Sequence, residues 1–224
     1  DNEITFTGSF SSATYGVVFR GPITNATVSG NMMDGGNVGG ANGGPPNTTA
    51  IYVATDDSWL GPLSSSAVLD ISNNYITGFE NGIAVYDRNT ATFGNLPTGA
   101  TLAIHDNSIT GNTLSVKSGA GETADASGNW WGAVDPATVA VGFEGPVDYT
   151  PWLATGTDTD PIATGFQGSF GTLYVDDDSP QAGSETRLIE AIGLVTSSTI
   201  YLTPGTYAEG PQVVIDSDLD IIGD

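Results

Sequence analysis

The chain has 224 residues, among them 26 Asp or Glu and only four Lys or Arg, so its formal net charge at pH 7 is −22. This acidity argues against nucleic acid and anionic membranes as partners, because both need Lys and Arg to neutralise phosphate. The absence of Cys excludes a disulfide framework and a thiolate metal site. Frequent Gly, Ser, Thr and Asn disfavour helices and favour short strands joined by turns, so we expect an all-β chain.

No apolar run is long enough to span a bilayer, so we expect no membrane insertion. The sequence begins without Met and without a signal peptide. We therefore expect a processed product, an excised domain or a segment of something longer.

A short pattern recurs along the first part of the chain, after an early strand pair at 4–6 and 16–19. In each copy an apolar residue and two further residues precede an Asn, and an apolar residue and a Gly follow it. The four asparagines are Asn31, Asn74, Asn107 and Asn129, which lie 43, 33 and 22 residues apart. Strand-like runs at 50–54, 82–86 and 113–117 follow the first three copies. The excess length is expected in loops at 34–49, 56–66 and 87–99.

Strands this short cannot bury an apolar face alone, but stacked coils of them share one continuous core. An Asn at the same corner of each coil tolerates a left-handed backbone and can form a ladder that satisfies stacked amides. The pattern therefore predicts a parallel β-solenoid with a structural Asn ladder. A β-sandwich with similar strands is the alternative, although its strands should alternate without a fixed Asn.

The coils resemble the pectate-lyase-like superfamily of right-handed parallel β-helices, of the kind found in large secreted tandem-repeat proteins. The stretches 126–132 and 147–153, which contain Asn-Trp-Trp-Gly and Tyr-Thr-Pro-Trp-Leu, resemble the last coil and exit of such domains. The stretches 173–175, 188–192, 200–209 and 219–223 resemble their beginning. The resemblance implies coils and an exit at 1–153, a linker at 154–171, and at 172–224 the cap and first coil of the next β-helix.

A capping helix is predicted at 184–195. Ser184 is its expected N-cap, and Leu188, Ile189, Ile192 and Val195 form an apolar stripe at helical spacing. This stripe is expected to cover the open end of a β-helix.

The cap follows the coils, whereas in a single domain of this family it precedes them. We therefore expect one period of a tandem array, or separate subunits that stack head to tail, with a circular permutant as a third possibility. Both leading options predict a non-closing contact that generates filaments. The predicted contact between units involves Ile4, Phe6, Leu219 and Ile221.

Catalytic chemistry finds little support in the sequence. The cations Arg20, Arg88, Lys117 and Arg187 and the only His, His105, fall on different coils, whereas polysaccharide lyases and hydrolases resembling this fold need basic residues beside carboxylates. We expect no catalytic residues and no certain cofactor. Calcium is possible at Asp176, Asp177 and Asp178, and less specifically at the acidic pairs 56–57 and 158 with 160.

Aromatic and Asn residues offer glycan-related features. Tyr52, Trp59 and Tyr86 are predicted to be exposed and able to stack on sugars, whereas Trp130, Trp131 and Trp152 are predicted to lie in the core or cap. Two further asparagines, at 25 and 47, fit the N-glycosylation pattern.

The leading hypothesis is therefore a structural module of an extracellular filament or cell-surface assembly, whose partners are copies of itself. The alternative is a carbohydrate-binding or adhesive module that uses loops 34–49 and 56–66. A polysaccharide lyase or hydrolase is the third hypothesis.

Overall fold

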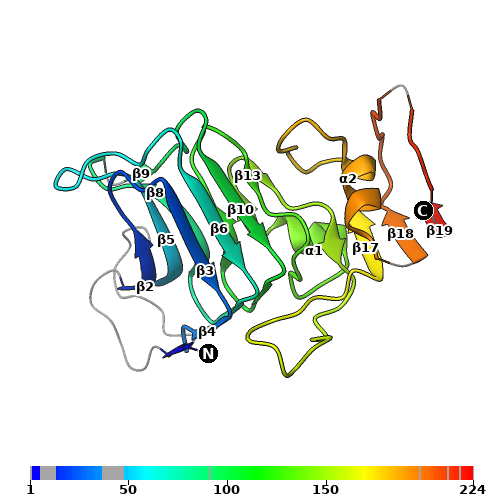
Figure 1. The fold of residues 1–224 in the computed structure, drawn as a ribbon, viewed down its shortest axis with the longest axis horizontal. Helices are drawn as coiled ribbons and strands as arrows, with labels where there is room; N and C mark the ends of the chain where they lie inside the picture. The colour runs from blue at the N-terminus through cyan, green and yellow to red at the C-terminus, as the bar shows by residue number, and fades with distance from the viewer. Residues whose placement is uncertain are drawn as a thin grey trace.

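The computed structural model describes residues 2–5, 14–36, 48–90, 92–196, 198–210, 212–216 and 218–223. Within these residues the chain is all-β, as predicted, and its sheets are almost entirely parallel (Figure 1). The two helices of the described chain are short, and neither is long and apolar enough to cross a membrane.

Three parallel sheets make up the N-terminal two thirds of the molecule. The first contains β1 (Asn2–Thr5), β4 (Asn31–Asp34), β7 (Tyr75–Thr77) and β11 (Ser108–Thr110). The second contains β3 (Asn25–Ser29), β6 (Val68–Ser72), β10 (Thr101–His105), β13 (Ala124–Asp125) and β15 (Val147–Asp148). The third contains β2 (Thr14–Phe19), β5 (Thr48–Asp56), β8 (Asn81–Asp87), β12 (Leu114–Lys117) and β14 (Phe143–Glu144), and β9 (Thr92–Phe93) pairs antiparallel with β8.

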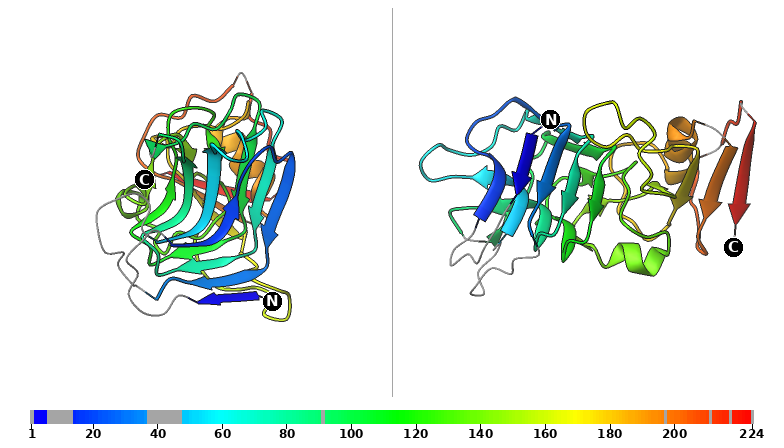
Figure 2. Two further views of the ribbon diagram at one scale, coloured as in Figure 1. Left: turned by 90° about the vertical axis from the view of Figure 1, so that its left-hand side faces the viewer. Right: turned by 90° about the horizontal axis from the view of Figure 1, so that it is seen from below.

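Each circuit of the chain adds one strand to each sheet. The path runs β3, β4, β5, then β6, β7, β8, and then β10, β11, β12, so equivalent strands of successive circuits are hydrogen-bonded neighbours. Viewed along the long axis, the strands surround a common interior (Figure 2, left).

The interior is filled by apolar side chains in register from circuit to circuit. Met33 pairs with Ile76, and Ile76 pairs with Ile109, and all three are fully buried. In the second sheet, Ile71 and Ile104 form an equivalent pair. Full burial of one such side chain contributes about 1.5–3 kcal/mol, and each of these side chains is paired with its equivalent on the neighbouring circuit.

The C-terminal third forms a fourth sheet. β16 (Trp152–Leu153) pairs antiparallel with β17 (Thr172–Val175), and β18 (Ser198–Leu202) and β19 (Leu219–Gly223) then continue in parallel. Figure 2 (right) shows β19 at one end of the molecule, far from β1 to β3. A small separate core packs here, made by Val175, Leu188, Ala191 and Ile200.

The predicted capping helix is shorter than expected. Helix α2 spans Arg187–Leu194, and its N-cap is Thr186 rather than Ser184. The Thr186 side chain makes no capping hydrogen bond, because its hydroxyl binds the carboxylate of Glu209 instead. Leu188 packs in the small core with Val175 and Ile200 of the fourth sheet, and the covering of an open β-helix end by the stripe stays a prediction. The other helix, α1 (Pro136–Ala140), is capped by the side chain of Asp135.

The segment 154–171, expected as a polar linker, lies folded against the first sheet. Phe166 is fully buried, and its carbonyl accepts a hydrogen bond from Asn73 Nδ2 at 3.1 Å. The Tyr75 hydroxyl donates to Asp158 at 2.7 Å. The segment therefore joins the two parts of the fold, and it is also held against the first part by packing and hydrogen bonds.

Candidate functional site

The structure brings the four repeated asparagines into one line. The backbone N–H of Asn31 donates to Asn74 Oδ1 at 3.0 Å, and the same contact links Asn74 to Asn107 and Asn107 to Asn129, each at 2.9 Å. Each Asn Nδ2 also donates to the next Asn Oδ1 at 2.9 Å. Asn2 extends the line, because its Nδ2 donates to Asn31 Oδ1 at 3.2 Å. Its signal in the sequence was the Asn-x-Ile-Thr spacing that it shares with Asn107.

The corner geometry differs from the expectation in one respect. The left-handed residue is the one before each Asn: Gly30, Asn73, Asp106 and Gly128 have φ of 70°, 56°, 54° and 71°. The ladder Asn itself supplies side-chain hydrogen bonds to backbone carbonyls, as Asn107 Nδ2 does to Ile71 at 2.8 Å. Buried carbonyls at the corner are thereby satisfied.

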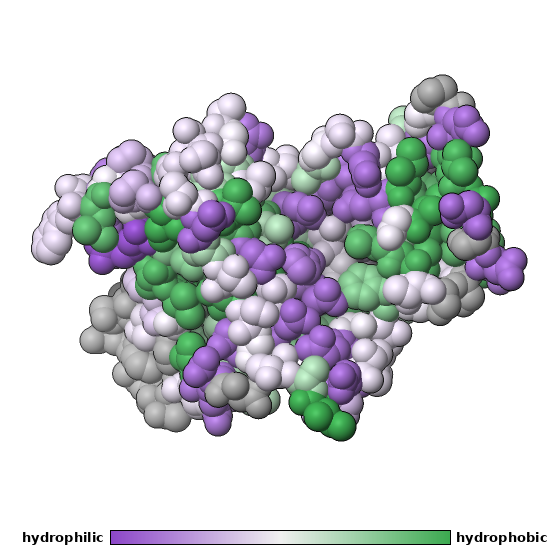
Figure 3. All heavy atoms as spheres, in the orientation of Figure 1, coloured by the Kyte–Doolittle hydropathy of each residue, from purple (hydrophilic) through white to green (hydrophobic). Residues whose placement is uncertain are grey.

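The predicted inter-unit residues lie at opposite ends of the molecule. Ile4, in β1, pairs with Met33 and packs on the main core. Leu219 and Ile221, in β19, pack on the small core. Phe6 lies outside the described residues. Figure 3 shows apolar side chains gathered at the end that carries β17 to β19, where Val214, Ile215 and Ile222 are exposed.

Asp176, Asp177 and Asp178 offer carboxylate oxygens that lie within 4.8 Å of one another. Two of these carboxylates also hold the turn after β18. Asp176 Oδ1 accepts from Thr203 Oγ1 at 3.2 Å, and Asp177 Oδ2 accepts from the backbone N–H of Thr206 at 2.6 Å. Oxygen ligands of this kind suit calcium, and calcium binding here stays a prediction.

A buried carboxyl lies where the last strand of the second sheet meets the C-terminal part. Asp148 has no exposed surface and accepts hydrogen bonds from the backbone N–H of Ala182 at 2.7 Å, from Gln181 Nε2 at 3.0 Å and from Ser179 Oγ at 3.2 Å. Gln181 Nε2 also donates to Glu190 of α2 at 2.9 Å. One amide group therefore bridges two carboxyl groups from the two parts of the fold.

These surroundings favour the protonated acid. Burial, together with the negative charges of Glu190 and Asp125, raises the pKa of Asp148 to about 7, although the hydrogen bond from Ala182 acts in the opposite direction. Burial also raises the pKa of Glu190. Sequence reasoning missed this site, because nothing in the local pattern marks Asp148 as buried.

The aromatic residues follow the expectation only in part. Tyr52 and Tyr86 are buried, so the prediction that they are exposed is wrong. They pack with Tyr15 on the outer face of the third sheet, where the neighbouring rings are tilted and their centroids lie 4.5 and 5.5 Å apart. Trp59 is exposed over 88% of its surface. Of the predicted core residues, Trp131 and Trp152 are buried, and Trp130 is half-buried.

Two of the cationic side chains that are distant in sequence contact the same carboxylate. Arg20 and Arg88 both contact Asp57, although they come from different circuits. His105 lies between Asp70 and Asp106, with nitrogen–oxygen distances of 3.1 and 3.4 Å. Its hydrogen bond with Asp106 and the charge of Asp70 raise the pKa of His105 to about 9, against the opposing effect of burial.

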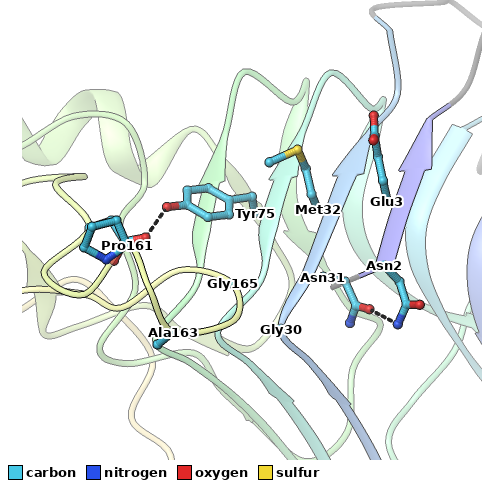
Figure 4. A pocket seen from close by; sticks show the side chains of 10 residues that line it. Asn2, Glu3, Gly30, Asn31, Met32, Tyr75, Pro161, Ala163 and Gly165 are labelled. Atoms are coloured by element: carbon cyan, nitrogen blue, oxygen red, sulfur yellow. Dashed lines mark hydrogen bonds between the residues drawn. The ribbon is translucent and has the colours of Figure 1, made fainter.

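A groove of about 530 Å³ opens on the outer face of the first sheet, beneath the segment 158–165 (Figure 4). The Tyr75–Asp158 hydrogen bond lies on one side and the Asn2–Asn31 bond on the other. Its described lining includes the carboxylates of Glu3 and Asp158 and no basic side chain. It therefore offers little to hold an anionic substrate.

Comparison with known proteins gave no match: no family model, no curated protein and no solved structure is detectably similar to this chain.

Proposed function

We propose that the chain is a right-handed parallel β-helix of the pectate-lyase-like kind, and that it serves as a structural repeat module in an extracellular filament or cell-surface assembly. The fold proposal is supported by three parallel sheets that receive one strand each per circuit, and by the ladder of Asn side chains at one corner. The placement outside the cell rests on the resemblance of the coils to large secreted repeat proteins.

One observation carries the assembly proposal: both ends of the stack present strand edges. Among the described residues, β1, β2 and β3 each pair with a strand on one side only, and β19 does so at the other end. An unpaired edge is a template for a further strand. Strands at the two ends differ, so their contact is heterologous and extends into a line instead of closing.

The side chains at these edges fit such a contact. Ile4 at one end and Ile221 at the other are half-buried and belong to inward-facing columns, because they pair with the buried Met33 and Ile200. A further circuit placed over either end would bury their remaining apolar surface. This burial is the same interaction that stabilises the interior circuits.

Light scattering over a concentration series and negative-stain electron microscopy test the proposal on the purified chain. We expect linear polymers whose length grows with concentration. Ile221→Lys should prevent polymer growth, because it places a charge in the column that the next unit must cover. Ile222→Lys is the matched control, since Ile222 lies in the same strand and is exposed.

Monomers alone at every concentration would contradict the assembly. So would polymers that Ile221→Lys leaves unchanged while its circular dichroism spectrum matches that of the wild type. Polymers lost equally in both variants would place the contact on the outer face of β19 and would contradict stacking of the cores.

An adhesive module that binds surface glycans is the second candidate function, and the exposed Trp59 beside two arginines favours it.

A further inference from the structure

Four side chains of three chemical kinds lie at the carboxyl ends of neighbouring strands in the third sheet. Arg20 directly follows β2, Asp57 directly follows β5, and Arg88 directly follows β8, and these three strands are neighbours in the order β2-β5-β8. Because the carboxyl ends of parallel strands meet at the same edge, residues 37 and 31 positions apart come into contact. Trp59 follows two residues after Asp57.

The Asp57 carboxylate holds this cluster together. Its carboxylate is almost fully buried and accepts Arg20 Nε at 2.7 Å on Oδ2, with Arg88 Nε 3.5 Å from the same oxygen. The other oxygen accepts the backbone N–H groups of Trp59 at 2.9 Å and Leu60 at 3.3 Å. These hydrogen bonds hold the pKa of Asp57 below its usual range. One ionised carboxylate thus fixes both the arginines and the turn that carries the indole.

The contact with Asp57 leaves the Arg88 guanidinium group partly exposed to solvent. The Arg88 side chain is 38% exposed, and its contact with Asp57 is made through Nε. A guanidinium group presents its N–H donors in a planar fork, which suits pairs of oxygen acceptors. Burial raises the pKa of the Tyr15, Tyr52 and Tyr86 hydroxyls, and the positive charge of Arg88 opposes this rise in all three.

A cavity of about 250 Å³ is lined by Arg20, Asp57, Ser58, Trp59 and Arg88. Pockets for drug-sized ligands hold roughly 300–1,000 Å³, so this one suits a single small ring, not a long chain lying in a groove. A rigid indole gives a large apolar contact surface at a low cost in conformational entropy. An apolar face beside planar donors matches a pyranose ring, which has C–H groups on its face and hydroxyl oxygens at its rim.

The charges near the cavity and the net charge of the chain favour a neutral ligand over an acidic one. Asp56, Asp57 and Asp87 end or directly follow the same strands as Arg20 and Arg88, so the carboxylates at these strand ends outnumber the two guanidinium groups. The whole chain carries a net charge of −22, which repels a polyanion. We propose that Trp59, Arg20 and Arg88 form a binding site for one unit of a neutral hexose polysaccharide, with the indole stacked on the ring and the guanidinium groups donating to its hydroxyls. This site does not depend on the assembly proposed above.

Affinity electrophoresis of the full chain tests the site, with neutral polymers (dextran, mannan and hydroxyethyl cellulose) and two anionic ones (polygalacturonate and alginate) in separate gels. We expect retardation by at least one neutral polymer and none by the anionic ones. Trp59→Ala should weaken that retardation at least tenfold, and Arg88→Gln should weaken it severalfold. Ile162→Ala is the matched control, because it removes another highly exposed apolar side chain that does not line the cavity.

Both substitutions change exposed side chains, so circular dichroism should show an unaltered fold. Retardation by the anionic polymers alone would overturn the neutral assignment. Absence of retardation by all of them, or equal retardation of Trp59→Ala and wild type, would overturn the site itself. Because assembly is scored by polymer length and binding by retardation, either proposal can fail without the other.

Discussion

Replacing Asp148 with Asn should change how stability depends on pH. The folded pKa of Asp148 is about 7, whereas an Asp in the unfolded chain titrates near 3.8. The folded state therefore holds a proton that the unfolded state has released. Stability from this group is complete below about pH 4 and is lost as the pH rises toward 7. At 1.36 kcal/mol per pKa unit, the loss is at most about 4 kcal/mol.

Urea unfolding at pH 5, 6.5 and 8 measures this effect. We expect the free energy of unfolding of the wild type to fall across the series, and that of Asp148→Asn to fall much less, because the amide has no proton to release. Glu190 and Asp125 face the same site, and the raised pKa of Glu190 leaves a residual slope of the same sign.

Asp135→Asn is the control. Hydrogen bonds from Thr138 lower the pKa of this exposed carboxyl, so any contribution that it makes is lost as the pH falls. A raised pKa of Asp148 is refuted if the free energy of unfolding of the wild type rises from pH 5 to 8. It is also refuted if Asp148→Asn keeps the pH dependence of the wild type.

Three further outcomes follow from the geometry. Asn107→Ala should lower the free energy of unfolding by roughly 3–5 kcal/mol, because it leaves buried donors and acceptors on both neighbouring circuits unpaired; Asn89→Ala, in an exposed turn, should cost far less, and equal losses would count against the ladder. Gly165→Ala should expose the segment 154–171 to limited proteolysis, because its φ is +78° and an added Cβ would meet backbone; Gly183→Ala, with φ +71° and open space around it, should leave cleavage unchanged. The His105 imidazole should titrate by NMR with a pKa near 9. Any stability that it contributes is therefore present below pH 6.5 and is lost as the pH rises through 9. A pKa near 6.5 would show that the contacts of His105 with Asp70 and Asp106 are absent in solution.

The parts of the fold that a short sequence pattern encodes were predictable. The repeated Asn and its flanking apolar residues indicated the stacked strands, because each circuit uses the same corner chemistry. Buried aromatic residues were not predictable in the same way. Tyr52 lies on the outer face of the third sheet, where a lone strand would expose it, and it is buried by neighbours that are distant in sequence.

The candidate sites depend on register between circuits. Arg20 and Arg88 are scattered in the sequence, and only the pairing of β2, β5 and β8 brings them to Asp57. Asp148 becomes buried because β16 and β17 reverse direction and return the chain over it. The spacing of residues along the sequence does not encode this contact or this burial. The sequence therefore indicated which residue types were available and not which of them come into contact.

The Asn ladder also has a direction. Each side-chain amide donates to the Asn of the following circuit, from Asn2 through to Asn129, so the amide dipoles add along the axis. In the described chain the end at Asn2 therefore offers a carbonyl oxygen as an acceptor. Two such ends brought face to face would set acceptor against acceptor. The ladder therefore gives each unit a direction along its axis. This polarity favours a head-to-tail line of units and disfavours pairs that join through identical ends.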